Sequence, residues 1–500
     1  MNSKRWHWLT AALALAVLAI ISYTLLSQGV RASAALNARA SVRASNSALA
    51  PTDARLNGAY RFQKGEWTYV HLQGTPDQIG YQHGYLLAPE IKDAFAAVKL
   101  EDVHNTKHNW KFFRDAAQNA LWPHIDAEYQ AELKGIVAGL NARGVKMDLD
   151  DVVALNAFME LPDYYAPWYD KQHKVPNAPK REVQGHCSAF VATGSWTKDG
   201  QIVIAHNNWT SYLEGERWRV IFDIQPEHGY RMIGDGFPGV IVSDDDFTIN
   251  SGGLMVTETT ISAFHGWNPD GIPEFVRARK AMQYADSIDD YVKIMLDGNN
   301  GGYANDWLIG DRNTGEIAQF ELGLKAHKVW RTKDGYFVGS NFTSDPTVTK
   351  LDTTYNENDP TMSPNARHIR WDALMKQYKG KIDVDLAEKF EADHFDAYTK
   401  KDGADGRTLC GHSDMNAKGD MAWDGVRPFD PMGAVQGKVT NSKMAAQMEL
   451  IARAGHPCGE NFYAKPFLAK HPQFDWQAPV LRDMIAGPWT EFQSDQHAGD

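Results

Sequence analysis

The stretch Cys187-Ser-Ala-Phe-Val-Ala-Thr-Gly-Ser-Trp-Thr-Lys-Asp-Gly-Gln-Ile-Val-Ile-Ala-His-Asn-Asn-Trp-Thr210 carries the clearest fold signal in the sequence. Residues 188–195 and 201–205 are apolar, β-prone runs, and the turn-forming residues Thr197 to Gly200 lie between them. Two such runs around a short turn predict a β-hairpin. The hairpin places Cys187 opposite the neighbourhood of Thr210, with an uncertainty of about two residues or roughly 7 Å. The polar segment 206–210 is therefore expected beside the cysteine.

Cys187 is a candidate nucleophile because of this position. A thiol is weakly ionised at neutral pH, so a catalytic cysteine needs a base or a positively charged neighbour. The base can be a histidine such as His206, or the α-amine of Cys187 itself if the chain is cut before it. Such a cut falls after His186, where Gly185 gives the backbone freedom. Polar residues at the end of a hairpin can equally be structural.

The N-terminal residues have the pattern of an export signal. Lys4 and Arg5 precede an apolar stretch over residues 9–26, and the small residues 32–35 follow. We expect residues 1–35 to be a signal peptide, with an uncleaved membrane anchor as the alternative. Both readings place the rest of the chain outside the cytoplasm, as a secreted or periplasmic protein. Residues 36–58 have the composition of a linker.

The remaining chain is expected to combine a helical part, residues 59–186, with a catalytic part, residues 187–500. Helical periodicity is found at 77–99 and 126–142, and one long helix is predicted over 273–296. Further strands are predicted at 219–224, 239–243, 253–260, 307–310, 317–321 and 335–338. From about residue 366 onwards, helical segments alternate with loops. Runs of strands with a few long helices predict an α+β fold.

Composition excludes some functions. The chain has 500 residues, 43% of them hydrophobic, and a formal net charge of -12. An acidic chain without a basic stripe does not favour nucleic-acid binding. Of its three cysteines, Cys410 and Cys458 can pair and leave Cys187 free, or all three can be buried small hydrophobic residues. The 18 histidines are not grouped at metal-ligand spacing, so no metal and no cofactor is expected.

Several segments, in this order along the chain, resemble the phospholipase B-like family, which belongs to the N-terminal nucleophile hydrolases. They are Cys187-Ser-Ala-Phe-Val, His206-Asn-Asn-Trp-Thr-Ser-Tyr, Asp245-Asp-Phe-Thr-Ile-Asn-Ser-Gly-Gly-Leu-Met-Val-Thr-Glu-Thr-Thr-Ile, Gly302-Tyr-Ala-Asn-Asp-Trp-Leu-Ile-Gly-Asp, Ser413-Asp-Met-Asn and Gly433-Ala-Val-Gln-Gly-Lys-Val-Thr. Each segment is weak evidence alone. The resemblance runs from Cys187 to beyond Thr440, and the N-terminal region fits less distinctly.

The resemblance implies a four-layer αββα sandwich with a helical N-terminal pro-region, akin to penicillin V acylases and bile-salt hydrolases. It implies autocatalytic cleavage between His186 and Cys187, after which the two fragments stay associated. It also implies that Cys187 is the nucleophile and that its α-amine is the base.

The remaining site residues are assigned by the same resemblance. His206, Asn341 and Arg367 are expected to be catalytic, and Trp209, Thr260 (or Thr259), Asn305 and Arg370 to line the substrate and oxyanion pocket. The Asn341 amide and backbone N–H groups near Cys187 or Asn207 are candidate donors to the carbonyl oxygen. The arginine that the family pattern expects directly after a Ser-Pro pair is delayed here to Arg367, with Arg370 close behind. Structural explanations also exist: Trp209 as core, Asn305 as a strand-ending residue and Arg367 as a solvated helix residue.

The sequence thus predicts an exported, self-processing cysteine hydrolase that acts on a carboxylic amide or an acyl ester. Its expected substrate is an acylated small molecule or a lipid, with a slight preference for the amide. One alternative is a catalytically silent extracellular binding protein of the same fold. The other is an unprocessed cysteine hydrolase that uses His206 as its base.

Overall fold

The computed structural model describes residues 53–179, 187–243, 247–418 and 427–499. The expected signal or anchor, most of the linker and the cleavage residue His186 lie outside these ranges. The chain divides into two compact units, residues 1–57 and 58–500. The described part of the first contains one short 3-10 helix, Ala54–Leu56, capped by the Asp53 side chain. In the described ranges we find no helix that is long and apolar enough to cross a bilayer.

The predicted hairpin is present in the second unit. Strand β3 (Ser188–Gly194) pairs antiparallel with β4 (Gly200–Ser211), and Ser188 lies opposite Asn207. Continuing this register places Cys187 opposite Asn208, two residues from the expected Thr210 and within the stated uncertainty. The chain therefore turns back as the local signals predict.

The hairpin belongs to a six-stranded sheet with the order β12-β3-β4-β15-β16-β17. The other strands are β12 (Gly335–Gly339), β15 (Met432–Asn441), β16 (Glu449–Ala454) and β17 (Thr490–Gln493). Strand β15 lies next to β4 in the middle of the sheet, although helices and loops were expected there. Both of its faces are buried, so its sequence lacks the alternation of polar and apolar residues that marks a half-exposed strand.

A second sheet has nine strands in the order β1-β2-β5-β6-β7-β8-β9-β10-β11. Its strands are β1 (Tyr60–Lys64), β2 (Trp67–Gly74), β5 (Val220–Pro226), β6 (Met232–Gly236), β7 (Thr248–Asn250), β8 (Leu254–Thr260), β9 (Asn305–Asp311), β10 (Glu316–Leu322) and β11 (His327–Thr332). The predicted strands at 219–224, 253–260, 307–310 and 317–321 are confirmed. The predicted strand at 239–243 is wrong, because this apolar segment forms a buried turn.

The β1–β2 hairpin was not predicted, since residues 59–186 were expected to be mostly helical. Strand β2 pairs in parallel with β5, with Thr68 opposite Val220. Residues before and after Cys187 consequently share one sheet. The rest of the N-terminal part is helical as expected: α2 (Pro76–Leu86), α3 (Ala88–Thr106), α4 (Trp110–Ala116), α5 (Ala127–Ala142), α6 (Leu149–Asn156) and α7 (Ala166–His173).

Helices α2 and α5 pack closely because α2 carries two glycines at the contact. A Cβ atom on Gly80 would lie 1.9 Å from the backbone oxygen of Glu132, and one on Gly84 would lie 2.1 Å from that of Ile136. Only glycine permits this approach. The tight α2–α5 pair is part of the layer that covers the nine-stranded sheet.

The later helices are α8 (Tyr212–Gly215), α9 (Glu274–Tyr284), α10 (Ile288–Leu296), α11 (Pro346–Asp352), α12 (Ser363–Gln377), α13 (Val384–Glu391), α14 (Ser442–Ala446) and α15 (Ala464–Lys470). The long helix predicted at 273–296 is two helices. The chain leaves α9 in an extended conformation at Ala285, and the Ser287 side chain caps the start of α10. The change of direction lets both short helices pack on the sheet.

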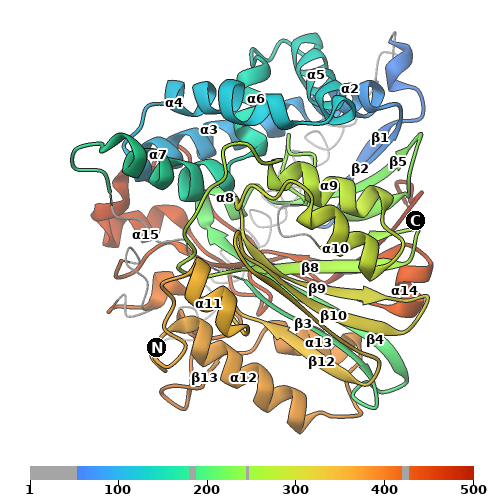
Figure 1. Ribbon diagram of the computed structural model, residues 1–500, viewed down its shortest axis with the longest axis vertical. Helices are drawn as coiled ribbons and strands as arrows, with labels where there is room; N and C mark the ends of the chain where they lie inside the picture. The colour runs from blue at the N-terminus through green and yellow to red at the C-terminus, as the bar shows by residue number, and fades with distance from the viewer. Residues whose placement is uncertain (1–52, 180–186, 244–246, 419–426, 500) are drawn as a thin grey trace, which may run out of the picture. The chain divides into compact units, whose positions relative to one another are not determined.

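Three apolar clusters hold these layers together. Val191 and Ile204 of the hairpin meet Met255 and Leu308 of the larger sheet in a cluster between the two sheets. A second cluster joins the nine-stranded sheet to α2, α3, α5, α9 and α10, and a third joins the six-stranded sheet to α12 and α13. Figure 1 shows α9 and α10 on one side of the strands and α12 on the other. The fold is α+β, as expected.

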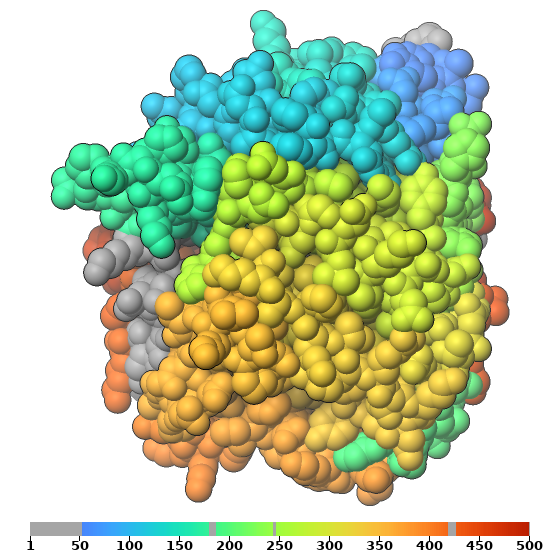
Figure 2. Space-filling model, viewed as in Figure 1, coloured from blue at the N-terminus to red at the C-terminus, as the bar shows by residue number. Residues whose placement is uncertain are grey.

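The helical N-terminal part and the α9–α10 pair form one continuous face. Figure 2 shows residues of α2–α7, in blue to green, directly against the yellow-green residues of α9 and α10. The buried contact includes the ion pair between Arg279 Nη1 and Glu132 Oε1, at 3.1 Å. The N-terminal helices are therefore an integral layer of this unit.

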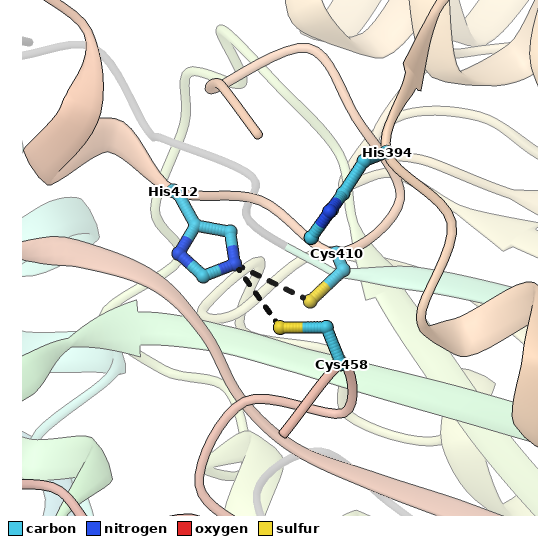
Figure 3. Close-up of side chains that lie close together, drawn as sticks. All are labelled: His394, Cys410, His412 and Cys458. Atoms are coloured by element: carbon cyan, nitrogen blue, oxygen red, sulfur yellow. Dashed lines mark hydrogen bonds between the residues drawn. The ribbon is translucent and has the colours of Figure 1, made fainter. Parts of the chain in front are cut away.

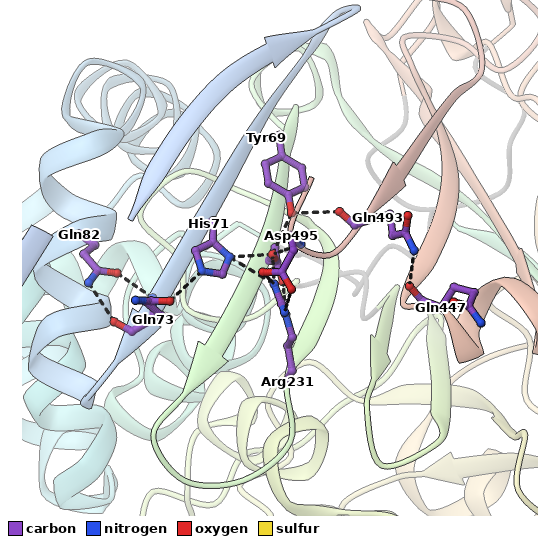
Figure 4. Close-up of polar contacts among 9 residues, drawn as sticks. Tyr69, His71, Gln73, Gln82, Arg231, Gln447, Gln493 and Asp495 are labelled. Atoms are coloured by element: carbon purple, nitrogen blue, oxygen red, sulfur yellow. Dashed lines mark hydrogen bonds and ion pairs between the residues drawn. The ribbon is translucent and has the colours of Figure 1, made fainter. Parts of the chain in front are cut away.

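A buried polar network ties the C-terminal residues to the nine-stranded sheet (Figure 4). Asp223 of β5 accepts hydrogen bonds from Tyr69 Oη at 2.8 Å and Arg231 Nε at 2.7 Å, and it contacts His71 Nδ1 at 2.7 Å. Arg231 also pairs with Asp495 at 2.6 Å. Because these groups come from distant parts of the chain, the network fixes the end of the chain against β2 and β5.

Candidate active site

Cys187 lies immediately before β3 and is buried. Its Sγ is 3.9 Å from Asn208 Oδ1 on the neighbouring strand β4 and 3.9 Å from Glu258 Oε1 on β8. Both sheets therefore contribute to the surroundings of the sulfur. Asn208 meets the thiol with its oxygen, and its Nδ2 is buried without a hydrogen-bond partner among the described residues. This amide leaves one donor available beside the nucleophile.

Glu258 is held by a second buried side chain, because Tyr303 Oη donates a hydrogen bond to Glu258 Oε1 at 2.9 Å. The reactive atoms of Cys187, His206 and Glu258 all lie within 4.8 Å of one another. The structure thus brings His206 to the cysteine, as the sequence predicts. A thiol, an imidazole and a carboxylate in one buried place are suited to proton transfer, and they are also ligand types for transition metals.

Arg367 joins the site from the other face of the six-stranded sheet. It lies on α12, is completely buried, and donates to the backbone oxygen of Cys187. It also donates to Ser188 Oγ at 3.0 Å, Asn341 Oδ1 at 2.9 Å and Ser363 Oγ at 2.9 Å. The expectation of a solvated helix residue is therefore wrong.

These hydrogen bonds of Arg367 all go to neutral oxygen atoms of described residues, and none of them goes to a carboxylate. Its guanidinium carbon lies 4.6 Å from the centre of the Trp209 ring, which offers a cation–π contact. Burial lowers the pKa of Arg367 to about 9, and the Cys187 side chain opposes this shift. The guanidinium therefore remains protonated at neutral pH.

Asn341 is fixed by contacts at both ends of its amide. Its Oδ1 accepts from Arg367, and its Nδ2 donates to the backbone oxygen of Thr260 at 2.9 Å. Its backbone is left-handed, with φ of 68°, a conformation that asparagine tolerates better than most residues. The predicted residues Asn341, Thr260 and Arg367 thus form one connected group next to Cys187.

The side chains of two predicted pocket residues point away from the sulfur. Asn207 Nδ2 donates to the backbone oxygens of Glu391 and Leu409, both at 2.8 Å. Successive side chains of a strand face opposite sides, so Asn207 faces α13 while Asn208 faces the sulfur. Arg370 pairs with Asp393 at 2.5 Å and lies over the Phe395 ring at 4.7 Å. These contacts give both residues structural roles.

Asn305 begins β9 and lies opposite Thr260 in the sheet. It is fully buried, and both polar atoms of its side chain lack a hydrogen-bond partner among the described residues. A buried amide without partners is costly, so Asn305 retains its place as a candidate pocket residue. Trp209 is buried as well, and its Nε1 donates to Leu409 O at 3.0 Å.

The sequence reasoning missed Asn208, Glu258 and Tyr303. Asn208 lies within the polar segment 206–210 that is expected beside the cysteine. The sequence does not tell which of the neighbouring residues Asn207 and Asn208 faces the sulfur, because this depends on the strand register. The sequence does mark Glu258, because it is the single carboxylate in an otherwise uncharged β-prone run. Acidic residues are rarely buried without a partner, so a glutamate at such a position is a candidate functional residue. Tyr303 had no distinguishing signal.

Fold and site together define an α+β protein with a buried, cysteine-centred polar site between two sheets. The sequence model of the phospholipase B family matches residues 77–347, more than half of the chain. The chain belongs to the phospholipase B family. The match includes Cys187, His206, Thr260 and Asn341 and ends before Arg367.

Individual relatives are distant. A Caenorhabditis elegans protein named "Putative phospholipase B-like 1" is 25% identical over 434 residues, 77% of this chain and 71% of that protein. Human phospholipase B-like 1 is 25% identical over 260 residues, 46% of each chain. An uncharacterized protein of Archaeoglobus fulgidus is 24% identical over 280 residues, 52% of this chain and 44% of the relative. The alignments thus span less than half the length of the human and archaeal proteins. Family membership indicates a hydrolase.

Proposed function

We propose that the protein is a cysteine hydrolase of the N-terminal nucleophile class, which cleaves a carboxylic amide or an acyl ester. Two sheets packed face to face with helices outside each support the four-layer αββα architecture of that class. The observation that carries the proposal is the position of Cys187, immediately before the inner strand β3, with its backbone held by Arg367 and its sulfur beside Asn208.

The same position of Cys187 supports autocatalytic processing. The sulfur of Cys187 attacks the carbonyl carbon of His186, the peptide nitrogen leaves as the new α-amine, and water hydrolyses the resulting thioester to a His186 carboxylate. The amine then lies on the nucleophile itself, with a reference pKa of about 7.7–8.0. The β2–β5 pairing and the packed N-terminal helices would keep both fragments together after the cut.

In turnover, the α-amine accepts the thiol proton and the sulfur attacks the substrate carbonyl carbon. Negative charge then develops on the carbonyl oxygen, and the unpartnered Nδ2 of Asn208 is a donor for it. Such a donor is worth roughly 2.7–4 kcal/mol in the transition state. The amine or alcohol leaves with the proton from the α-ammonium, and water hydrolyses the thioester. N-acyl compounds and acyl-ester lipids both fit this reaction, with the amide preferred. The proposed location is outside the cytoplasm, because residues 1–35 have the sequence pattern of an export signal.

His206 favours a second mechanism, because its ring lies within 4.8 Å of the Cys187 sulfur and of Glu258. In that case His206 is the base and no cut is needed. A third alternative is a silent binding protein that retains the fold without turnover.

The mass of the purified full-length protein separates these alternatives. We expect two fragments with a break between His186 and Cys187, and a single uncut chain for Cys187→Ala. Thr193→Ala is the matched control, because it changes a buried side chain at the far end of the same strand, and it should still be cut. An uncut wild-type chain would overturn the proposed processing.

Turnover of the purified protein is then measured on N-acyl amino acids and lysophospholipids. Activity in an uncut wild-type chain would support the His206 mechanism, whereas a folded, uncut and inactive wild-type chain would support the binding protein.

A further inference from the structure

Four metal-ligating side chains meet at a place that the proposed reaction does not use. They are His394, Cys410, His412 and Cys458, and Figure 3 shows the ring of His412 turned toward both sulfurs. Their ligand atoms all lie within 4.8 Å of one another. No disulfide joins the two cysteines, both of which are free in the structure. All four residues lie after the part of the chain that the family model matches.

The distances agree with one shared ion. His412 Nε2 is 3.6 Å from Cys410 Sγ and 3.5 Å from Cys458 Sγ. A tetrahedral zinc ion with Zn–S of about 2.3 Å and Zn–N of about 2.05 Å separates a sulfur and a nitrogen ligand by about 3.6 Å. The two measured edges therefore match those of a zinc-sized tetrahedron.

We propose that His394, Cys410, His412 and Cys458 form a structural Zn²⁺ site. Two thiolates and two imidazoles are the ligand set of closed zinc sites, and four protein ligands leave no position open for substrate or water. Soft sulfur ligands disfavour magnesium and calcium. A ring nitrogen of His394 lies within 4.8 Å of both sulfurs and of the His412 ligand atom.

The site would fix a buried segment that has little regular structure. His394 lies just before β13 (Phe395–Asp396), Cys410 and His412 lie in the irregular segment after β14 (Lys401–Asp402), and Cys458 follows β16. One ion would thus join three segments that are far apart in the sequence. Because the site does not exist in the unfolded chain, the free energy of binding the ion would add to the stability of this segment.

The same segment supports the candidate active site. Leu409, directly before Cys410, accepts hydrogen bonds from Asn207 and Trp209 of β4. The Trp209 ring packs in one apolar cluster with Cys410 and Cys458, and the Arg367 guanidinium carbon lies 4.6 Å from its centre. The zinc would therefore hold Trp209, and through it Arg367, in place. Its role is positioning and does not depend on the proposed reaction.

Elemental analysis of the full-length protein, purified without a histidine tag or chelator, tests the site. We expect about one zinc per chain in the wild type and at least a tenfold loss in Cys458→Ser and His412→Asn. Cys187→Ser is the matched control, because it makes the same change at the third cysteine, and it should retain the zinc. Zinc lost in Cys187→Ser but retained in Cys458→Ser would assign the metal to Cys187, His206 and Glu258, and would overturn the proposal.

A second measurement covers the case in which the variants fail to fold. Wild-type protein stripped of metal is titrated with Co²⁺, and we expect the absorption bands of tetrahedral cobalt–thiolate together with a higher Tm. Thiols are also counted after denaturation in chelator, and the proposal expects three per chain. A count of one would show a Cys410–Cys458 disulfide, and either this count or the absence of cobalt–thiolate bands would overturn the zinc site.

Discussion

The Arg367 guanidinium lies over the Trp209 ring, 4.6 Å from its centre, and donates to the backbone oxygen of Cys187. A planar cation can stack on the ring and donate in several directions at once, which lysine cannot do. This contact connects the helix α12 to the start of β3, where the candidate nucleophile lies. The geometry of Cys187 therefore depends on a residue 180 positions later in the chain.

Arg367→Lys should lower processing and turnover at least tenfold. The ammonium group cannot reach Cys187, Ser188 and Asn341 together, and each buried acceptor left unpaired costs about 1–3 kcal/mol. Arg370→Lys is the matched control on the same helix. The ion pair between Arg370 and Asp393 is partly exposed. We therefore expect Arg370→Lys to change the free energy of unfolding by no more than about 1 kcal/mol. Urea unfolding and the fraction of cut chain measure both effects, and equal effects of the two substitutions would contradict the assignment.

Asn208 and Asn207 should respond differently to the same substitution. Asn208→Ala removes a donor beside the sulfur, so turnover should fall by about 10²–10³-fold with a small change in stability. Asn207→Ala removes two buried hydrogen bonds to carbonyl oxygens, so it should destabilise the fold by about 1–3 kcal/mol. Kinetics and urea unfolding of both variants check this prediction. The reverse pattern would show that Asn207, and not Asn208, faces the sulfur.

Gly411→Ala should destabilise the protein by about 1–3 kcal/mol. A Cβ atom at Gly411 would lie 1.9 Å from Cη2 of Trp209, in the six-membered part of the indole ring. Trp209→Phe removes these ring atoms, so the cost of Gly411→Ala should largely disappear in that background. A double-mutant cycle by urea unfolding measures the coupling, and additive effects would exclude a direct contact.

The His71–Asp223 pair should make stability depend on pH. Burial alone raises the pKa of Asp223, but hydrogen bonds from His71 and Arg231 outweigh it and lower this pKa. Burial lowers the pKa of His71, but the hydrogen bond to Asp223 outweighs it and raises this pKa. The Asp223 contribution is complete above its unfolded pKa of about 3.9 and is lost as pH falls through the lower folded value. The His71 contribution is complete below about 6.5 and is lost as pH rises through the higher folded value.

We therefore expect the pair to stabilise most between about pH 4 and 6.5. His71→Gln should remove the loss of stability on the alkaline side, and Tm measured from pH 4 to 9 tests this. The exposed His228→Gln is the control and should keep the wild-type profile. Parallel curves for His71→Gln and the wild type above pH 6.5 would contradict the prediction.

The sequence by itself determined the features that depend on near neighbours. The β3–β4 hairpin, the helix α5 over residues 127–142, and the closeness of Cys187 to segment 206–210 all follow from local periodicity and turn residues. These signals act within about 20 residues, and they sufficed to place the candidate nucleophile at the start of a strand. The runs of strands with a few long helices indicated the α+β class, and the family resemblance added Asn341 and Arg367 as expected site residues.

Only the tertiary structure decided which side chains meet. A shift of one residue in the register moves every side chain of a strand to the other face, so the choice between Asn207 and Asn208 needed the observed pairing of β4. Strand β15, buried on both faces, has no alternation to reveal it. Glu258 reaches Cys187 from the other sheet, and His394, Cys410, His412 and Cys458 converge from three segments. Contacts of this kind depend on the closure of long loops, and no local pattern of residues encodes them.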